Sequence, residues 1–410
     1  MQTQELIPNL FRTEFSKIVS VLCKTFGLSN IQLAEDLVSD TFLAASATWG
    51  LKGIPDNPTA WLYTVAKNKA RDTFRREKVF RDKVKPELEH QPNSSEAFDI
   101  DLSEHNIKDS QLKMLFAICN PIVSSEAQIA LALRILCGFG VAEIAKAFLG
   151  KIETINKRLH RAKTALRKEN IDLGIPSPTA MENRLNNVLS VLYLLFNEGY
   201  YSTTNEKNIR KELCFEAMRL NYLLLEYTPT NRSHTNALMA LFCFHASRFE
   251  ARTNKNGSQI IYSEQNTELW NKELIEKGKH YLYESAKEKR FSKYHLEAAI
   301  AYWHTEPTDS QKKWESILQL YNQLLQLEYS PIVALNRTYA LAKANGIQEA
   351  ITECLKIDLK NNHLYHLLLA ELYESVNGQK QRNHLKEALR LADTQSERKW
   401  ILNKLTAIDK

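Results

Sequence analysis

Glycine is scarce in this sequence, with 12 among 410 residues, less than half of the usual share of about 7 %. Neither GxxxxGK[ST] nor GxGxxG occurs, so the two common phosphate-cradling loops and the nucleotide chemistry they serve are excluded. Stretches that alternate apolar and polar residues are few, whereas Leu, Ala, Lys, Glu and Asn are abundant. This composition predicts an all-α fold with almost no sheet.

Paired cysteines and long apolar runs are also lacking. No CxxC pair occurs, and the N-terminus MQTQELIPNLFRTEF lacks the charged, apolar and small-residue pattern of a signal peptide. The longest apolar run, Val188 to Phe196, is far shorter than the roughly 20 residues that span a bilayer. We therefore expect a cytoplasmic protein with reduced cysteines, no membrane span, no metal and no cofactor.

Charge is unevenly distributed along the chain. The net charge is +6, but residues 61–85 and 151–170 are clearly basic, whereas 86–109 carries seven carboxylates and one lysine. Two basic blocks separated by an acidic one suggest two contacts with a single polyanion such as DNA.

Helical spacing of apolar residues divides the chain into blocks. Breaks occur at 27–30, at 50–58, where Asn57 is expected to cap a helix beginning at Pro58, and at 175–178. Two segments near the C-terminus share an Asn-Gly at a 32-residue offset, close to the tetratricopeptide period of about 34 residues. We predict two small helical domains over residues 1–80 and 110–175, joined by an acidic linker over 81–109. A C-terminal domain of stacked helical hairpins is predicted over 180–410.

The stretch VAEIAKAFLGKIETINKRLHRAKTALRKEN (141–170) predicts a helix-turn-helix. An apolar seam of Ile152, Ile155, Leu159, Ala162 and Leu166 leaves the cations of the second helix outside. Such a face is either solvated or lies in a DNA groove. In the second case Thr154, Asn156, Lys157 and His160 suit base edges, and Arg158, Arg161, Lys163 and Arg167 suit phosphates.

A second basic block, DNPTAWLYTVAKNKARDTFRREK (56–78), predicts another amphipathic helix. Trp61 is expected in the core. Tyr63 and Asn68 are candidates for contacts with exposed bases, beside the polar and charged residues Lys67, Arg71, Asp72, Arg75 and Arg76. The alternative is again a solvated helix face.

Two further segments are candidates for protein contacts. Acidic residues Glu35, Asp36 and Asp40 interleave with an apolar stripe, which fits either a solvated face or a docking face. The segment Asn197-Glu198-Gly199-Tyr200 follows the longest apolar run. A lone Glu198 is expected to be a cap or to form an interdomain salt bridge rather than to act as a catalytic acid.

The order of AEDLVSDTFLAA, NPTAWLYTVAKNKARDTFRRE, an acidic linker and SSEAQIALALRILCGFGVAEIAKAFLGKIETINKRLHRAK resembles an extracytoplasmic-function sigma factor over residues 6–170. The continuation RLNNVLSVLYLLFNEGYYST is similar to the subgroup with a C-terminal tetratricopeptide-like extension. In one departure, Asn120 stands where relatives commonly have histidine, which supports the expectation that no metal binds there.

This resemblance implies roles for particular residues. Asp36, Leu37, Asp40 and Phe42 would lie in the helix that docks on core RNA polymerase. Asn68, Arg71, Asp72, Arg75 and Arg76 would lie in or beside the helix that reads the minus-ten element. Thr154, Asn156, Lys157, Arg158 and Arg161 would belong to the minus-35 reading helix. Residues 197–200 would belong to the junction with the extension, which would set activity or bind a regulatory protein.

The resulting hypothesis is a sigma factor without a catalytic centre that binds core RNA polymerase and promoter DNA, and no membrane. Two alternatives remain. One is a helix-turn-helix regulator that never docks on polymerase. The other is a helical-repeat scaffold or enzyme whose basic helices are only solvated.

Overall fold

The computed structural model describes residues 3–84, 100–148, 150–200, 210–252, 260, 262–288, 291–392 and 395–408. Within these ranges the backbone forms helices, turns and loops, and no strand. The predicted all-α fold is thereby confirmed for the described part of the chain. Across the same residues, no helix combines the length and apolar character that crossing a membrane requires. The chain divides into two compact units, Met1–Leu192 and Tyr193–Lys410.

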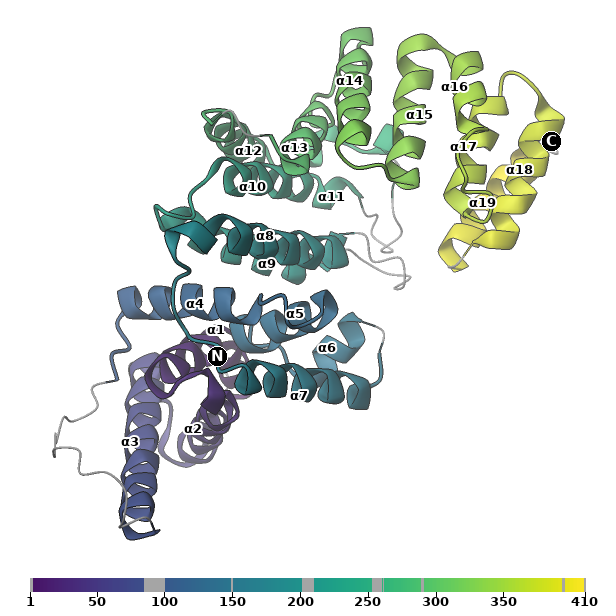
Figure 1. Cartoon of the computed structure of the whole chain (residues 1–410). Coiled ribbons are helices and arrows are strands. Elements are labelled where there is room, and N and C mark those ends of the chain that lie inside the picture. The colour runs from purple at the N-terminus through teal and green to yellow at the C-terminus, as the bar shows by residue number, and fades with distance from the viewer. Residues whose placement is uncertain are drawn as a thin grey trace. The chain divides into compact units, whose positions relative to one another are not determined.

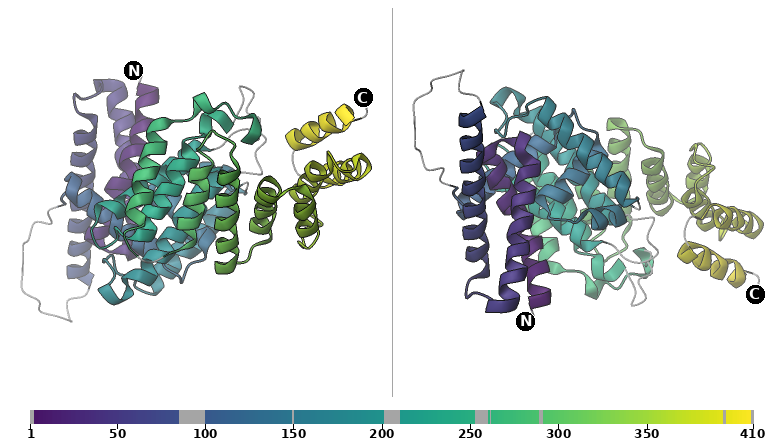
Figure 2. Two further views of the ribbon diagram at one scale, coloured as in Figure 1. Left: turned by 90° about the horizontal axis from the view of Figure 1, so that it is seen from above. Right: turned by 90° about the horizontal axis from the view of Figure 1, so that it is seen from below.

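Unit 1 begins with three long helices that lie alongside one another, α1 (Thr3–Phe26), α2 (Ile31–Lys52) and α3 (Pro58–Val84) (Figure 2). A short 3-10 turn, η1 (Leu28–Asn30), joins the first two. The Asn57 Oδ1 accepts a hydrogen bond from the Ala60 N–H at 2.9 Å, so α3 begins capped at Pro58 as the sequence predicts. The core between these helices is apolar and fully buried at Phe15, Ile18, Val38 and Leu62.

The second half of unit 1 consists of shorter helices. They are α4 (Glu104–Ile118), α5 (Ser125–Leu131), η2 (Ala132–Leu136), α6 (Val141–Ala147) and α7 (Ile152–Lys168) (Figure 1). η2 is a π-helical turn, in which the Cys137 N–H donates to the Ala132 carbonyl oxygen at 3.1 Å. Such a turn holds one residue more than a turn of α-helix and is frequent at functional positions.

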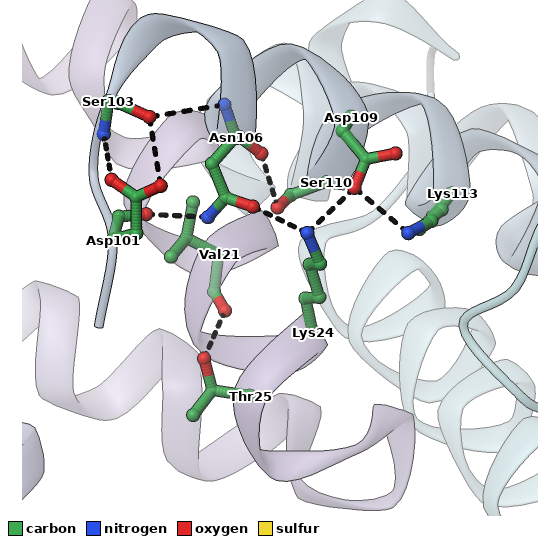
Figure 3. A network of polar contacts seen from close by, with 9 residues as sticks. All are labelled: Val21, Lys24, Thr25, Asp101, Ser103, Asn106, Asp109, Ser110 and Lys113. Carbon is green, nitrogen blue, oxygen red and sulfur yellow. Dashed lines mark hydrogen bonds and ion pairs between the residues drawn. The ribbon is translucent and has the colours of Figure 1, made fainter. Parts of the chain in front are cut away.

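The two small domains expected at 1–80 and 110–175 are packed together in unit 1. Helix α4 lies against α1, and α7 lies against η1. Figure 3 shows the Lys24 ammonium of α1 between Asn106 and Asp109 of α4, and its ion pair with Asp109 measures 2.7 Å. The sequence could not reveal this contact, because the partners are 85 residues apart.

Both ends of the linker expected at 81–109 are helical, so any linker is shorter than predicted. Helix α3 continues to Val84 and α4 already begins at Glu104, while 85–99 lie outside the described residues. The polar residues before α4 form its cap: the Asp101 carboxylate accepts from the Ser103 N–H at 2.8 Å, and the Ser103 hydroxyl accepts from the Asn106 N–H (Figure 3).

Helix α8 (Pro178–Tyr200) begins in unit 1 and ends in unit 2. The sequence placed the boundary near 180 because of the prolines there, but these prolines only precede and begin a helix that is periodic and unbroken. Two side chains of its unit 1 portion bind the end of α4: Arg184 donates to the Phe116 carbonyl oxygen, and Asn187 donates to that of Cys119.

Unit 2 continues with consecutive helices. Its first part contains α9 (Lys211–Glu226), α10 (Ser233–Ala246), α11 (Phe249–Arg252), η3 (Tyr262–Glu264), η4 (Thr267–Leu269), α12 (Lys272–Ser285) and α13 (Lys293–Trp303). Its second part contains α14 (Gln311–Leu327), α15 (Pro331–Asn345), α16 (Ile347–Cys354), α17 (His363–Tyr373), α18 (Gly378–Leu391) and α19 (Gln395–Ile408).

Neighbouring helices of unit 2 pack as hairpins, among them α14 with α15, α15 with α16 and α17 with α18 (Figure 1). Both Asn-Gly pairs lie at helix ends: Asn345 ends α15 and Gly346 follows it, whereas Asn377 precedes α18 and Gly378 begins it. Gly346 has a φ of 111°, which a residue with a side chain rarely adopts. Asn377 caps α18 by accepting from the Lys380 N–H at 2.9 Å. Helical hairpins are therefore present in this part of unit 2, while the tetratricopeptide-like repeat stays a prediction.

Candidate nucleic-acid interface

Helices α6 and α7 are joined by a short turn, which the Gly150 N–H closes by donating to the Ala145 carbonyl oxygen at 2.8 Å. The predicted apolar seam of α7 is buried over most of its length: Ile155, Leu159, Ala162 and Leu166 are each no more than 4 % exposed. Ile152, at the first turn, is instead 52 % exposed. The buried seam fixes which face of α7 is directed away from the core.

That outer face carries most of the predicted reading residues. The side chains exposed on it include Thr154, Asn156, Lys157, His160 and Arg161. Arg158 is half-buried, with its guanidinium carbon 5.6 Å from the centroid of the Phe148 ring. The structure therefore gathers hydrogen-bonding and cationic groups on one side of a helix that follows a tight turn, as DNA recognition by a helix requires.

Lys163 does not belong to this exposed face. Its ammonium group donates to a carboxylate oxygen of Glu35 in α2 and, at 3.1 Å, to the Gln32 Oε1. Only 15 % of its side chain is exposed. In this arrangement Lys163 is occupied by α2, and the phosphate contact predicted for it requires these bonds to break.

Helix α3 presents a second polar face. Leu62, Ala66 and Ala70 are fully buried, while Asn68, Asp72, Arg75 and Arg76 are exposed and Lys67 and Arg71 are half-buried. Trp61 packs edge-to-face on Trp49 with ring centroids 5.3 Å apart, but it is only half-buried, so the core position expected for it is reached only in part. The exposed residues recur at helical spacing, so they form one continuous face.

Tyr63 is held by a neighbouring helix. Its hydroxyl donates to the Glu14 Oε2 of α1 at 2.6 Å. Burial raises the pKa of Tyr63 well above its usual range, and the Glu14 carboxylate raises it further. The hydroxyl thus has a structural partner, and the base contact predicted for Tyr63 would have to use the ring or displace Glu14.

On α2, Asp36 and Asp40 are exposed, one helical turn apart, whereas Leu37 and Phe42 are buried at 7 % and 5 % exposure. The Phe42 ring packs edge-on against Phe11 of α1 at 5.0 Å. A direct polymerase contact by Leu37 or Phe42 therefore does not fit this packing, because both side chains face the core. Leu43, which sequence reasoning missed, is 67 % exposed. In the sequence, only its position three residues after Asp40, on the same helix face as the acidic residues, indicates that Leu43 is exposed.

Residues 197–200 lie in unit 2, which begins at Tyr193. The Glu198 carboxylate accepts from the Arg210 guanidinium at 2.6 Å, and the same guanidinium donates to the Glu198 carbonyl oxygen. Tyr200 is 1 % exposed beneath the Arg252 guanidinium, whose carbon lies 4.1 Å from the ring centroid. Glu198 thus forms a salt bridge, but within unit 2, between α8 and the start of α9, and not between domains as expected.

Few of the described residues could act as reactive thiols or as metal ligands. The six cysteines are buried, and burial raises the pKa of the Cys119, Cys243 and Cys354 thiols to about 12. In the described ranges, no group of three or more His, Cys, Asp and Glu residues is arranged to hold a metal ion.

Residues 10–79 match the family described as Sigma-70 region 2, which places that region on α1, α2 and most of α3. Residues 184–286 match a family of unknown function (DUF6596). The uncharacterized protein R00370 of Rhizobium meliloti (strain 1021) is 32 % identical over 377 residues, covering 91 % of this chain and 89 % of the relative. No solved structure matches the chain. The chain therefore belongs to one family with R00370, and its residues 10–79 carry a Sigma-70 region 2.

Proposed function

We propose that this protein is a sigma factor of the extracytoplasmic-function type that binds core RNA polymerase and directs promoter-specific transcription initiation. The Sigma-70 region 2 match carries the proposal, because it covers the helices that bear the exposed acids of α2 and the exposed polar face of α3. In this proposal the polymerase supplies the chemistry, and the chain supplies recognition in the cytoplasm.

The polar face of α3 is assigned to the minus-ten element. Arg75 and Arg76 supply cations for the phosphate backbone, and Asn68 supplies an amide that can bond to an exposed base edge. Melted DNA presents such edges, so this face suits the strand that is opened at initiation.

The outer face of α7 is assigned to the minus-35 element. Thr154, Asn156 and His160 offer short polar groups for base edges in a major groove, while Lys157 and Arg161 offer cations to the adjacent phosphates. The helix-turn-helix role of α6 and α7 belongs to this proposal.

The exposed acids Asp36 and Asp40, with Leu43 beside them, are assigned to docking on the polymerase. Two carboxylates one turn apart next to an apolar side chain suit a basic helical partner, since charge complementarity guides docking and apolar burial adds affinity. The helical hairpins of unit 2 are assigned to modulating activity, with a regulatory protein as a possible partner and a tetratricopeptide-like mode of binding.

Run-off transcription with purified core polymerase tests the proposal. We expect the full chain to direct transcripts from defined start sites on fragments of the source genome. The Asp36→Ala/Asp40→Ala variant is expected to lose initiation together with polymerase binding. Failure of the folded full chain to bind core polymerase would refute the sigma assignment.

The second candidate is a DNA-binding regulator that does not dock on polymerase, favoured by the exposed basic face of α7 alone. Under that reading, Asp36→Ala/Asp40→Ala binds DNA and acts as the wild type does. If Lys157→Ala/Arg161→Ala leaves DNA affinity unchanged, the remaining candidate is a helical-repeat scaffold.

A further inference from the structure

Two cations of unit 2 are buried beside one tyrosine ring. Lys313 of α14 is 1 % exposed, and Arg248, between α10 and α11, is 7 % exposed. The Arg248 guanidinium carbon lies 4.9 Å from the centroid of the Tyr262 ring, and the Lys313 ammonium nitrogen lies 5.2 Å from it. Lysine and arginine are almost never this buried unless an anion is paired with them.

The hydrogen-bond partners of Lys313 are neutral. Its ammonium donates to the Tyr262 hydroxyl at 2.7 Å and to the Glu306 carbonyl oxygen at 2.6 Å. Burial lowers the pKa of Lys313, although the charges of Asp309 and Glu306 raise it in part. The Asp309 carboxylate is exposed and accepts from the Trp314 indole N–H instead. Within the described ranges, no carboxylate oxygen lies within 4.0 Å of the Lys313 ammonium.

A third cation, Arg252, lies one helical turn after Arg248, at the end of α11. Its guanidinium carbon is 4.1 Å from the centroid of the Tyr200 ring, and the guanidinium makes no hydrogen bond or ion pair with the described residues. His245 lies beside the same tyrosine, with ring centroids 4.4 Å apart. Burial lowers the pKa of His245 well below its usual value, and the charges of Arg248 and Arg252 lower it further. Three cations therefore converge on one part of unit 2.

Two buried nitrogen atoms beside these cations, His304 Nδ1 and the Trp270 indole nitrogen, find no hydrogen-bond partner among the described residues. The His304 and Tyr262 ring centroids are 4.9 Å apart, and the Arg248 guanidinium carbon is 6.0 Å from the centroid of the Trp270 ring. Burial, with the charges of Arg248 and Lys313, lowers the pKa of His304 to about 3, so its neutral ring can donate one N–H. A buried polar group without a partner calls for a water or an ion that it binds.

The burial of these groups is graded. Arg248 and Lys313 are buried, whereas Arg252, Tyr262 and His304 are half-buried and so reach the surface. An anion can approach past the half-buried groups. The buried cations attract it more strongly than exposed ones would, because water and salt screen them less.

We propose that Arg248, Arg252 and Lys313 form a binding site for a small anion that carries a diphosphate group. His304 and Trp270 supply further donors. Three cations suit a ligand with several negative charges, and phosphate oxygens match both guanidinium and ammonium donors. Such a site uses side chains and needs no glycine-rich loop. This inference concerns unit 2 and does not depend on the proposed function.

Calorimetric titration of the full chain with inorganic pyrophosphate tests the site. At constant ionic strength in potassium chloride, the wild type is expected to bind pyrophosphate saturably. Lys313→Met should weaken binding roughly 10-fold or more, the usual size of one charged hydrogen bond. The matched control Lys312→Met removes the exposed neighbouring cation and should bind as the wild type does. Absence of saturable binding by the folded wild type would overturn the site.

Two further variants keep the test decisive. Arg252→Gln alters a half-buried side chain, so it tests the site even if Lys313→Met fails to fold, and it should also weaken binding. Lys157→Ala/Arg161→Ala removes two exposed cations of α7 and should leave pyrophosphate affinity unchanged. Wild-type affinity in Arg252→Gln, or a loss of affinity in the α7 variant alone, would contradict the proposal.

Adenosine diphosphate distinguishes the two sources of a diphosphate group. Tighter binding than that of pyrophosphate would assign the Tyr262 and His304 rings to stacking on a base and the site to a nucleotide. Equal or weaker binding would assign the site to the free diphosphate. Lys313→Met must weaken the binding of whichever probe binds more tightly, and undiminished affinity would overturn the site.

Discussion

Gly199 of α8 packs so closely against Cys214 of α9 that a Cβ on the glycine would lie 2.7 Å from the cysteine Sγ and 2.8 Å from the Arg210 carbonyl oxygen. The Gly199 carbonyl oxygen also accepts from the Arg210 N–H at 2.9 Å. Two backbones meet here, so neither side can yield without moving a helix. The segment 197–200 therefore has a packing role in unit 2 that its sequence alone did not specify.

Replacing this glycine is expected to destabilise unit 2. Gly199→Ala should lower the free energy of unfolding by about 1–3 kcal/mol, because the added methyl overpacks the α8–α9 contact. Gly378→Ala is the matched control, since a Cβ there meets nothing within 4 Å; its stability should stay equal or rise by up to about 1 kcal/mol. Chemical denaturation of both variants provides the comparison, and equal losses would contradict the packing argument.

Glu297 should make the stability of unit 2 depend on pH. Burial raises the pKa of Glu297 to about 7, although a hydrogen bond with Tyr193 and the charge of Lys293 lower it. Because the folded-state pKa lies above the ordinary value of 4.5, this contribution to stability is fully present below pH 4.5 and is lost as pH rises through about 7.

Glu297→Gln keeps a neutral side chain and should remove most of that dependence. At pH 8 the variant is expected to be more stable than the wild type by up to about 3 kcal/mol, at about 1.4 kcal/mol per pKa unit. At pH 4.5 the two should unfold at similar denaturant concentrations. Glu374→Gln, which alters an exposed carboxylate, serves as the control, and parallel pH profiles for all three proteins would count against the assignment.

The cations of α7 should differ in their effect on DNA binding. Lys157→Ala/Arg161→Ala removes two exposed cations and should reduce the slope of log affinity against log salt by about 2. Lys163→Ala should change the slope less, because the Lys163 ammonium is bound by Glu35 and is not free to contact a phosphate. Fluorescence anisotropy across a salt series separates the two. A larger slope change for Lys163→Ala would reverse the assignment.

Substitutions in α2 should divide into docking and folding effects. Asp36→Ala/Asp40→Ala should weaken core polymerase binding while the thermal midpoint stays within a few degrees, because both side chains are exposed. Phe42→Ala should cost about 3–5 kcal/mol of stability, since it empties a buried site packed on Phe11. Calorimetry and a polymerase pull-down, run on the same preparations, test both statements. If Phe42→Ala keeps normal stability but loses polymerase binding, Phe42 contacts the polymerase directly and this prediction is wrong.

Periodic apolar residues were the most informative part of the sequence. The spacing of Ile155, Leu159, Ala162 and Leu166 predicts the buried face of α7, and the same spacing defines which of its cations are exposed. These predictions succeed because burial of a helix face is determined by residues three and four positions apart.

The sequence did not predict which polar side chains pair with each other. Glu35 was grouped with its acidic neighbours, although it shares a helical stripe with Ile31, Val38 and Phe42, which are buried. Its partner Lys163 is 128 residues away, and a lysine on a basic helix gives no sign of which anion will hold it. Tyr63 and Glu14 present the same difficulty at a separation of 49 residues.

The π-helical turn at Ala132–Leu136 contains one residue more than a regular α turn would, and Arg134 lies in its middle. Each residue advances a helix by about 100°. A single-codon deletion in this turn would leave a continuous α-helix while rotating the segment that follows by roughly that angle relative to α5. The bonds from Arg134 to Glu35 and Phe139 could then not both form. An in-frame deletion of three nucleotides, without any change in the residues that would read DNA, is therefore enough to separate Arg134 from one of these two partners.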